Sequence, residues 1–220
     1  VQDDVTCRLL GNAGLRPTQA WVKSRESGVF AGEAILDAFC NEVPSLNFKT
    51  ALKDGALFQS GETLVELQGS AQECLSLERT LLNLLSLACG VATLTRKYVD
   101  AIRPYPTEIL ATRKTVPGLR EVQLLAVVAG GGKIHRRSLA DGILIKDNHI
   151  TVLGEKALLE RAVLTRSPLH GIEIEVQSLE SLKRVLESPL PDVIMLDNLS
   201  VEEMRLAMSQ IKKLNTLGSD

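Results

Sequence analysis

The chain has 220 residues, of which 45% are hydrophobic and only 3% aromatic, and its formal net charge is −2. This length allows one large domain or two small ones with a substantial core. A nearly neutral chain with few aromatic rings lacks the basic face and the stacking surface of nucleic-acid-binding or membrane-surface proteins, so we expect neither partner.

The cysteines also bear on the setting in which the chain works. The four cysteines are widely spaced and form no Cys-x-x-Cys pair. This pattern argues against a disulfide framework and favours a reduced, cytoplasmic environment. We expect no signal peptide and no membrane span, because no apolar run approaches the ~20 residues that a bilayer requires.

The first 70 residues mix short strand-like and turn-like segments, which predicts a small α+β domain. Extended runs are expected at 20–25, 46–53 and 62–68, and a short helix at 32–39.

The segment from 70 to 102 predicts helix, with leucines on nearly every side. Such a helix should be buried all round, between domains or subunits. We expect Gly90 to end a first helix and residues 93–102 to form a second, more polar one.

From residue 107 onward, strands and helices alternate. Apolar strands are predicted at 108–111, 142–146, 172–176 and 192–196, and helices at 118–129, 155–165, 179–187 and 201–212. This alternation predicts a parallel sheet, open or closed into a barrel. Because four strand–helix units are too few to close a barrel, and the chain ends where another strand should begin, we expect an open domain that is truncated at its C-terminus.

Ionisable residues follow every one of these strands, and the C-terminal ends of parallel strands form the active-site rim of α/β folds. The strand-end residues are Arg113 and Lys114, then Lys146 and Asp147, then Glu175, and finally Asp197 and Asn198. Taken singly, each has a structural explanation as a loop charge, a paired strand-end group, or a turn or helix cap. Their recurrence after all four strands favours a shared site.

The signs of these charges suggest two roles. The cationic groups suit the binding of a small polyanion, because arginine forks bind carboxylates and phosphates at two points. His135 could join them, although a role as an ordinary loop residue fits it equally well. Together they are Arg113, Lys114, His135, Arg136, Arg137 and Lys146, beside a Gly130–Gly132 turn. Glu175 and Asp197 are expected to hold Mg²⁺ together with substrate oxygens, or to orient ribose hydroxyls.

Arg79 lies inside the leucine-rich segment, directly after Glu78. A buried guanidinium without a partner is strongly unfavourable. It should therefore pair with Glu78 or another group, or point at an anionic ligand, and the residues alone favour the Glu78 pair.

Several motifs, in this order and spacing, resemble the quinolinate phosphoribosyltransferases, also called nicotinate-nucleotide pyrophosphorylases (carboxylating). They are Asp3-Asp4-Val5-Thr6, Glu78-Arg79-Thr80, Gly90-Val91-Ala92-Thr93, Thr112-Arg113-Lys114-Thr115, Pro117-Gly118-Leu119-Arg120, Gly130-Gly131-Gly132, His135-Arg136, Ile145-Lys146-Asp147-Asn148-His149, Glu173-Ile174-Glu175-Val176 and Leu196-Asp197-Asn198.

The resemblance implies an α/β fold with an N-terminal α/β sandwich-like domain (1–103) and an open, incomplete α/β barrel (104–220). It implies a homodimer that uses Mg²⁺ and converts quinolinate and phosphoribosyl pyrophosphate to nicotinate mononucleotide, pyrophosphate and CO₂ in NAD biosynthesis. The family's Ser-Gly-Gly and Gly-Ala phosphate loops are expected beyond residue 220, and the N-terminal arm is expected to be shortened.

The resemblance also implies roles for individual residues. Arg79 would enter the site of the partner subunit. The quinolinate carboxylates would lie among Thr112, Arg113, Lys114, His135 and Arg136. Lys146 would contact the ligands near the reacting centre, and Glu175 and Asp197 would lie on the ribose and Mg²⁺-pyrophosphate side. The implied catalytic groups are Lys114, Lys146, Glu175 and Asp197.

At several positions the chain departs from the family pattern. Ala111 stands where the family commonly has Asp, Ile134 where it has Asn, Ser138 where it has Gly, and Leu124-Leu125 where it has Lys-Tyr. None of these changes removes a charge named above.

Two other functions fit the residues. One is a Schiff-base, aldolase-like barrel enzyme in which Lys146 is the nucleophile. The other is a non-catalytic paralogue that binds pyridine carboxylates or pairs with an active subunit.

Overall fold

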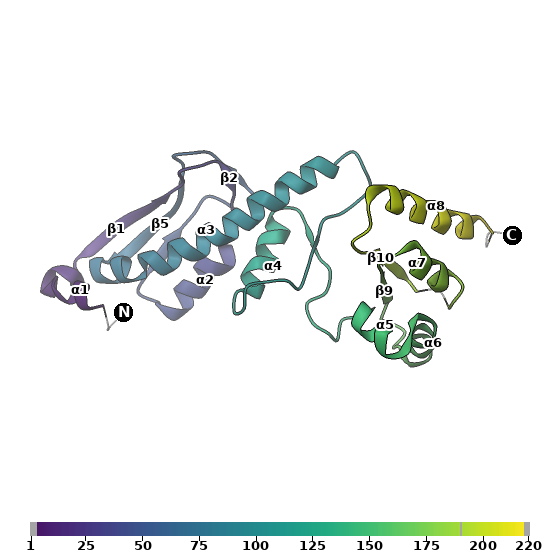
Figure 1. The fold of residues 1–220 in the computed structure, drawn as a ribbon. Coiled ribbons are helices and arrows are strands. Elements are labelled where there is room, and N and C mark those ends of the chain that lie inside the picture. The colour runs from purple at the N-terminus through teal and green to yellow at the C-terminus, as the bar shows by residue number, and fades with distance from the viewer. Residues whose placement is uncertain (1–3, 190, 218–220) are drawn as a thin grey trace. The chain divides into compact units, whose positions relative to one another are not determined.

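The computed structural model describes residues 4–189 and 191–217, and the chain packs as two units that divide between His135 and Arg136 (Figure 1). The sequence places residues 104–135 in the barrel domain. In the structure they group with the first unit, because helix α4 (Arg120–Ala129) packs against helix α3 (Ala71–Ile102).

The first unit is built on a small antiparallel sheet with the strand order β1-β5-β3. Its strands are β1 (Pro17–Lys23), β3 (Asn47–Lys49) and β5 (Thr63–Ser70). A second antiparallel pair is formed by β2 (Gly28–Val29) and β4 (Leu57–Phe58). The other elements of this part are α1 (Val5–Arg8), a 3-10 helix (Gly11–Leu15) and α2 (Glu33–Glu42). The short helix and the extended runs expected before residue 70 are therefore confirmed.

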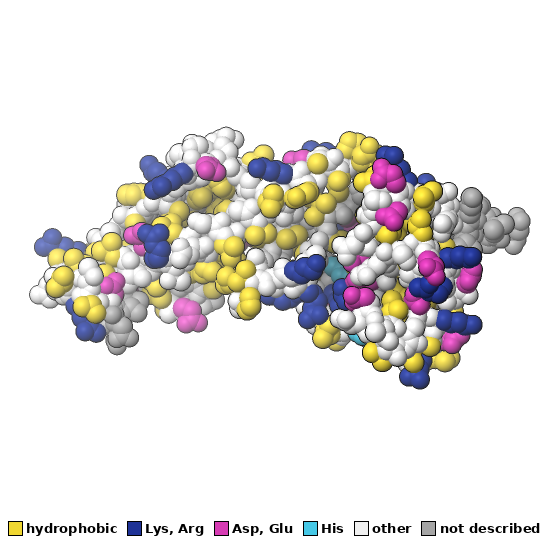
Figure 2. Space-filling view, viewed as in Figure 1, with side chains coloured by type: hydrophobic (Ala, Val, Ile, Leu, Met, Phe, Trp, Pro, Cys, Tyr) yellow, Lys and Arg dark blue, Asp and Glu magenta, His cyan; other side chains and the backbone are white. Residues whose placement is uncertain are grey.

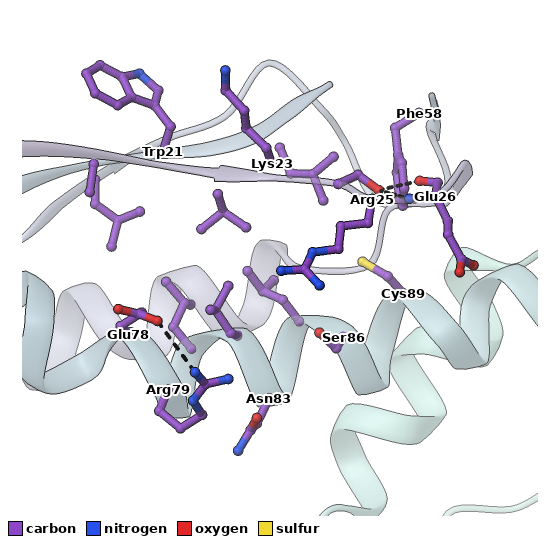
Figure 3. Close-up of a pocket in the computed structure, with 18 of the residues that line it drawn as sticks. Trp21, Lys23, Arg25, Glu26, Phe58, Glu78, Arg79, Asn83, Ser86 and Cys89 are labelled. Atoms are coloured by element: carbon purple, nitrogen blue, oxygen red, sulfur yellow. Dashed lines mark hydrogen bonds and ion pairs between the residues drawn. The ribbon is translucent and has the colours of Figure 1, made fainter. Parts of the chain in front are cut away.

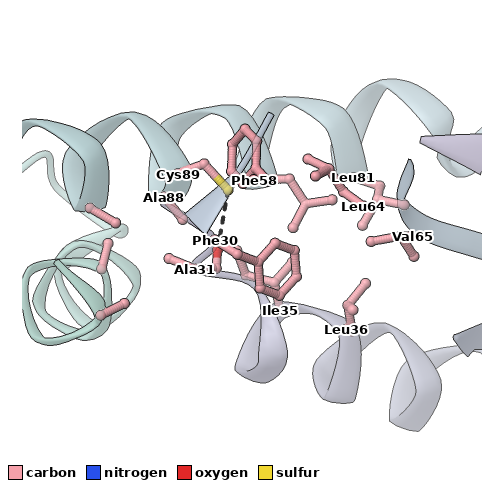
Figure 4. Packing of buried hydrophobic residues seen from close by; sticks show 14 of the residues in the cluster. Phe30, Ala31, Ile35, Leu36, Phe58, Leu64, Val65, Leu81, Ala88 and Cys89 are labelled. Atoms are coloured by element: carbon pink, nitrogen blue, oxygen red, sulfur yellow. Dashed lines mark hydrogen bonds between the residues drawn. The ribbon is translucent and has the colours of Figure 1, made fainter. Parts of the chain in front are cut away.

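The core of this unit lies where α2, α3 and the strands meet (Figure 4). Phe30, Val65 and Leu81 are at most 1% exposed. Burying a side chain of this size stabilises the fold by roughly 1.5–3 kcal/mol. The Cys89 thiol also lies in this core, 3.9 Å from the backbone carbonyl oxygen of Ala31.

Helix α3 differs from the expectation in two ways. It runs unbroken through Gly90, because Ala88, Cys89 and Ala92 on either side of that glycine are buried and hold the helix against the core. It is also not buried all round, since Leu75 and Leu94 are more than half exposed. A capping box at Ser70 and Glu73 fixes its start.

The expectation that no segment could span a membrane was wrong by length and composition, because α3 is long and apolar enough to do so. This is weak evidence for a membrane span, because the core helix of a soluble protein can have the same length and apolar composition.

The Gly130–Gly132 turn fits closely against α3. A Cβ atom at Gly130 would lie 2.5 Å from both the Ala92 carbonyl oxygen and Thr95 Cβ, and one at Gly132 would lie 2.7 Å from Val127 Cγ1. Arg96 Nε donates to the Gly130 carbonyl oxygen at 3.1 Å. The close backbone approach expected at these glycines is therefore an approach to a helix of the same unit.

This packing predicts opposite effects at two glycines of the first unit. Gly130→Ala should lower the free energy of unfolding by about 1–3 kcal/mol, as overpacking does. Gly90→Ala should raise it by about 0.5–1 kcal/mol, because no described atom lies within 4 Å of the added Cβ and alanine is the better helix former. Urea unfolding of both variants checks this, and the same sign for the two would contradict it.

The second unit holds a parallel sheet with the order β10-β9-β8. Its strands are β8 (Ile143–Ile145), β9 (Ile172–Val176) and β10 (Val193–Leu196), and its helices are α5 (Asp147–Leu153), α6 (Glu155–Thr165), α7 (Leu179–Leu186) and α8 (Val201–Leu217). The sheet is open, as expected.

One of the four expected parallel strands does not belong to this sheet. Strand β6 (Leu110–Ala111) pairs in parallel with β7 (Lys133–Ile134) in the first unit. Strand β7 was not predicted, because two residues between a glycine turn and a basic cluster give no strand pattern.

Candidate functional site

Lys146 and Glu175 form the centre of the site in the second unit. The parallel register aligns Ile145 with Ile174, so that Lys146 lies beside Glu175 at the ends of β8 and β9. Lys146 Nζ is 2.6 Å from Glu175 Oε2. Glu175 is only 6% exposed, whereas 42% of the Lys146 side chain remains accessible. A buried carboxylate needs such a cation, and the ammonium group can still reach a ligand.

Asp197 joins this pair through Gln177, which the sequence analysis missed. Gln177 Nε2 lies 3.3 Å from both Glu175 Oε1 and Asp197 Oδ2. Side chains alternate along a strand, so Gln177 follows Glu175 on the same face, which is the signal that could have identified it. The structure thus brings together three predicted residues, Lys146, Glu175 and Asp197.

Asn198 fixes the turn that carries Asp197. Its backbone has a φ of +55°, in the left-handed region that asparagine tolerates better than most residues, and its Nδ2 donates to Asp197 Oδ2 at 2.7 Å. The cap of α8 is Ser200, which exchanges hydrogen bonds with Glu203. Of the two structural explanations for Asp197-Asn198, the turn is confirmed and the helix cap is not.

A second group of predicted residues follows β6 and β7 in the first unit. Thr112 follows β6 and His135 follows β7, and these strands are parallel neighbours, so both residues leave the same edge. Thr112 Oγ1 accepts from the Lys114 backbone N–H at 3.1 Å and closes the turn. Arg113 and Lys114 are exposed on that turn.

Two of the departures from the family pattern turn out to be neighbours. Ala111 of β6 and Ile134 of β7 are direct partners in the parallel register. A polar pair of the family is thus replaced here by an apolar pair. Since two small apolar groups side by side leave no buried polar group without a partner, the double change is compatible with the fold.

The departure at Ser138 stabilises the loop that follows Arg136. The Ser138 hydroxyl donates to Asp141 Oδ1 at 2.7 Å, and the Arg137 and Ser138 backbone N–H groups donate to Oδ2 at 2.7 and 3.0 Å. These bonds, the hydroxyl first, hold the pKa of the Asp141 carboxyl below its ordinary value. The remaining departure, Leu124, is buried in α4 at 2% exposure.

Arg79 lies on the exposed face of α3, with 76% of its side chain accessible and Glu78 Oε1 3.7 Å away. The expected Glu78 pair is therefore present, but the guanidinium is not buried. The expectation of a buried arginine was wrong because this face of α3 is open in the described chain.

Arg79 lines a groove of about 1160 Å³ between β1 and α3 (Figure 3). Its lining includes the apolar residues Leu81, Leu85 and Cys89. Arg25, just beyond the end of β1, projects into the groove. Figure 2 shows apolar side chains exposed over this unit. Trp21, Leu75 and Leu94 are each more than half exposed.

Carboxylates at the strand ends of the second unit are candidate ligands for Mg²⁺. Among the described residues, no group of three or more His, Cys, Asp and Glu side chains could hold a metal ion by itself. Glu175 and Asp197, bridged by Gln177, fit the smaller donor set that Mg²⁺ uses when substrate phosphates supply the other ligands.

Comparison with known proteins places both parts of the chain in one family. The model of the quinolinate phosphoribosyl transferase N-terminal domain matches residues 4–89, and that of the C-terminal domain matches residues 91–217. The chain is 40% identical over 210 residues to the nicotinate-nucleotide pyrophosphorylase (carboxylating) of Mycobacterium leprae, covering 94% of this chain and 73% of the relative. It is 39% identical over 199 residues to the probable enzyme of the same name from Bacillus subtilis, covering 87% and 67%.

Solved structures agree. The nicotinate-nucleotide pyrophosphorylase of Francisella tularensis superposes with a TM-score of 0.85 at 33% identity, over 96% of this chain and 74% of that one. The enzyme of Ehrlichia chaffeensis gives 0.86 at 31% identity, over 95% and 76%. The chain therefore belongs to the quinolinate phosphoribosyl transferase family.

Proposed function

We propose that this protein transfers the phosphoribosyl group of phosphoribosyl pyrophosphate to quinolinate and decarboxylates the product, giving nicotinate mononucleotide, pyrophosphate and CO₂ for NAD synthesis. The observation that carries this is the Lys146–Glu175–Asp197 set on neighbouring parallel strand ends, in a chain that matches both domains of the family.

The reaction needs positioning and charge neutralisation more than a covalent intermediate. The pyridine nitrogen attacks the anomeric carbon of the ribose. The bond between this carbon and the pyrophosphate oxygen breaks, and its electron pair leaves with pyrophosphate. The alkylated nitrogen then accepts electrons as the 2-carboxylate leaves as CO₂, and the ring carbon takes up a proton. Lys146, fixed by Glu175, presents a cation where negative charge has to be stabilised.

We assign the binding of the quinolinate carboxylates to Arg113, Lys114, His135 and Arg136, with Thr112 shaping the turn. Glu175 and Asp197 would hold Mg²⁺ jointly with substrate oxygens, and the bound ion would neutralise charge on the pyrophosphate. These assignments are supported by the family resemblance and by the strand-end positions.

We further propose that the protein works as a homodimer in which Arg79 serves the site of the second copy. The open groove beside Arg79, with Leu75 and Leu94 exposed on α3, supports a protein partner on this face. A partner on this face would cover the apolar side chains of α3 that the single chain leaves exposed.

The structure argues against the Schiff-base alternative. A lysine nucleophile must be free to attack the carbonyl carbon of its substrate. Lys146 Nζ is instead held in an ion pair with Glu175 Oε2 at 2.6 Å. Borohydride reduction in the presence of a carbonyl substrate should therefore trap no adduct on Lys146.

Release of labelled CO₂ tests the proposed function directly. The protein, as its gene encodes it, should release label from 2-carboxyl-labelled quinolinate only when phosphoribosyl pyrophosphate and Mg²⁺ are both present. A protein that binds quinolinate but releases no label at saturating substrates would instead be the non-catalytic paralogue.

A further inference from the structure

Lys146 is held at its backbone as well as at its side chain. It is the N-cap of α5 and lies directly after β8. Its N–H donates to Nδ1 of His149 at 2.9 Å, and the His149 N–H donates back to the Lys146 carbonyl oxygen at 2.8 Å. The two residues thus close a reciprocal turn at the point where the strand becomes a helix.

The imidazole takes part in this turn as a hydrogen-bond acceptor, through Nδ1. In this position the imidazole does what a Glu or Gln side chain does three residues after an N-cap, where it accepts the N–H of the cap residue.

This hydrogen bond adds to the other restraints on the start of α5, where the Ile150 N–H donates to the Lys146 carbonyl oxygen at 2.9 Å and Ile150 packs against the core of the unit. The helix has seven residues, and none of these described residues is buried. A helix this short is not stable by itself, so its end groups decide whether the first turn forms. The Lys146 side chain starts from this turn and ends 2.6 Å from Glu175.

We infer that His149 is a positioning residue that orients Lys146 in the proposed transferase site. It acts by accepting the Lys146 N–H and does not itself exchange a proton with the substrates. Only the expected effect of His149 on turnover rests on the proposed function, since the hydrogen bond between Lys146 and His149 is present in the chain itself.

Replacement at position 149 tests this role. His149→Ala removes the acceptor and should lower kcat about tenfold or more, as a small misplacement of a catalytic group does. His149→Gln supplies the acceptor of an ordinary capping box and should stay within about threefold of the parent. If Gln is as impaired as Ala, the imidazole has a chemical role and the inference is wrong. His170→Ala, on a histidine outside the site, is the matched control and should leave kcat unchanged.

A second measurement needs no turnover. Acetylation of Lys146 by acetic anhydride, followed by mass spectrometry, should be several-fold faster in His149→Ala than in the parent or in His149→Gln. Lys183, which is 75% exposed, serves as the internal reference. Equal Lys146 labelling in all three proteins would overturn the inference, even in a protein that shows no transferase activity. A parent that shows this labelling pattern but no turnover would count against the proposed function alone.

Discussion

Replacing Lys146 by methionine should both lower turnover strongly and destabilise the second unit. The substitution leaves Glu175, at 6% exposure, as a buried carboxylate without its cation. Breaking a fully buried pair costs about 3–5 kcal/mol, and because Lys146 is partly exposed we expect about 1–3 kcal/mol here. Loss of one preorganised charge should lower kcat by about 10²–10³-fold.

The double variant Lys146→Met, Glu175→Leu separates the two effects. Apolar side chains of similar size often replace an ion pair without loss of stability. The double variant should therefore unfold at nearly the urea concentration of the parent while remaining inactive. Lys183→Met, which removes an exposed lysine 4.0 Å from Glu187, is the control and should change stability by less than about 0.5 kcal/mol. A double variant less stable than Lys146→Met would show that Glu175 is stabilised by something other than Lys146.

The strands of the second unit could be predicted because each is an apolar run with clear ends, whereas helix α5 was not predicted. Strands β8, β9 and β10 lie within the expected ranges, and the strand-end rule placed Lys146, Glu175 and Asp197 together. This rule uses only the direction of the strands, which an alternating β/α pattern fixes.

The errors arise where tertiary packing outweighs local preference. Gly90 reads as a helix end, yet the buried residues around it keep α3 continuous. The partnership of Ala111 with Ile134 depends on β7, which has no sequence pattern of its own.

Strand alternation could have placed Gln177 beside Glu175, but not its hydrogen bond to Asp197. The role of His149 could not be predicted, because it depends on a side-chain hydrogen bond rather than on the strand and helix pattern. His149 belongs to the Ile145-Lys146-Asp147-Asn148-His149 motif, but the motif does not reveal that its side chain accepts the Lys146 N–H in the turn.

Arg79 provides the sharpest test of the proposed dimer. Arg79→Ala and Lys146→Ala should each be inactive alone, because a two-fold dimer would build each site from one Lys146 and the Arg79 of the other copy. When the two variants are unfolded and refolded as an equal mixture, random pairing gives about half heterodimers.

In each heterodimer, one site has both groups intact and the other has lost both. Activity should therefore return to about a quarter of the parent value. The exposed guanidinium is consistent with this arrangement, since 76% of the Arg79 side chain is accessible and its Glu78 contact, at 3.7 Å, is long for an ion pair. If Arg79 instead serves its own copy, every heterodimer site lacks one group and the mixture stays inactive. Native mass spectrometry of the mixture must show the heterodimer, so that an inactive sample that contains it rejects the shared site.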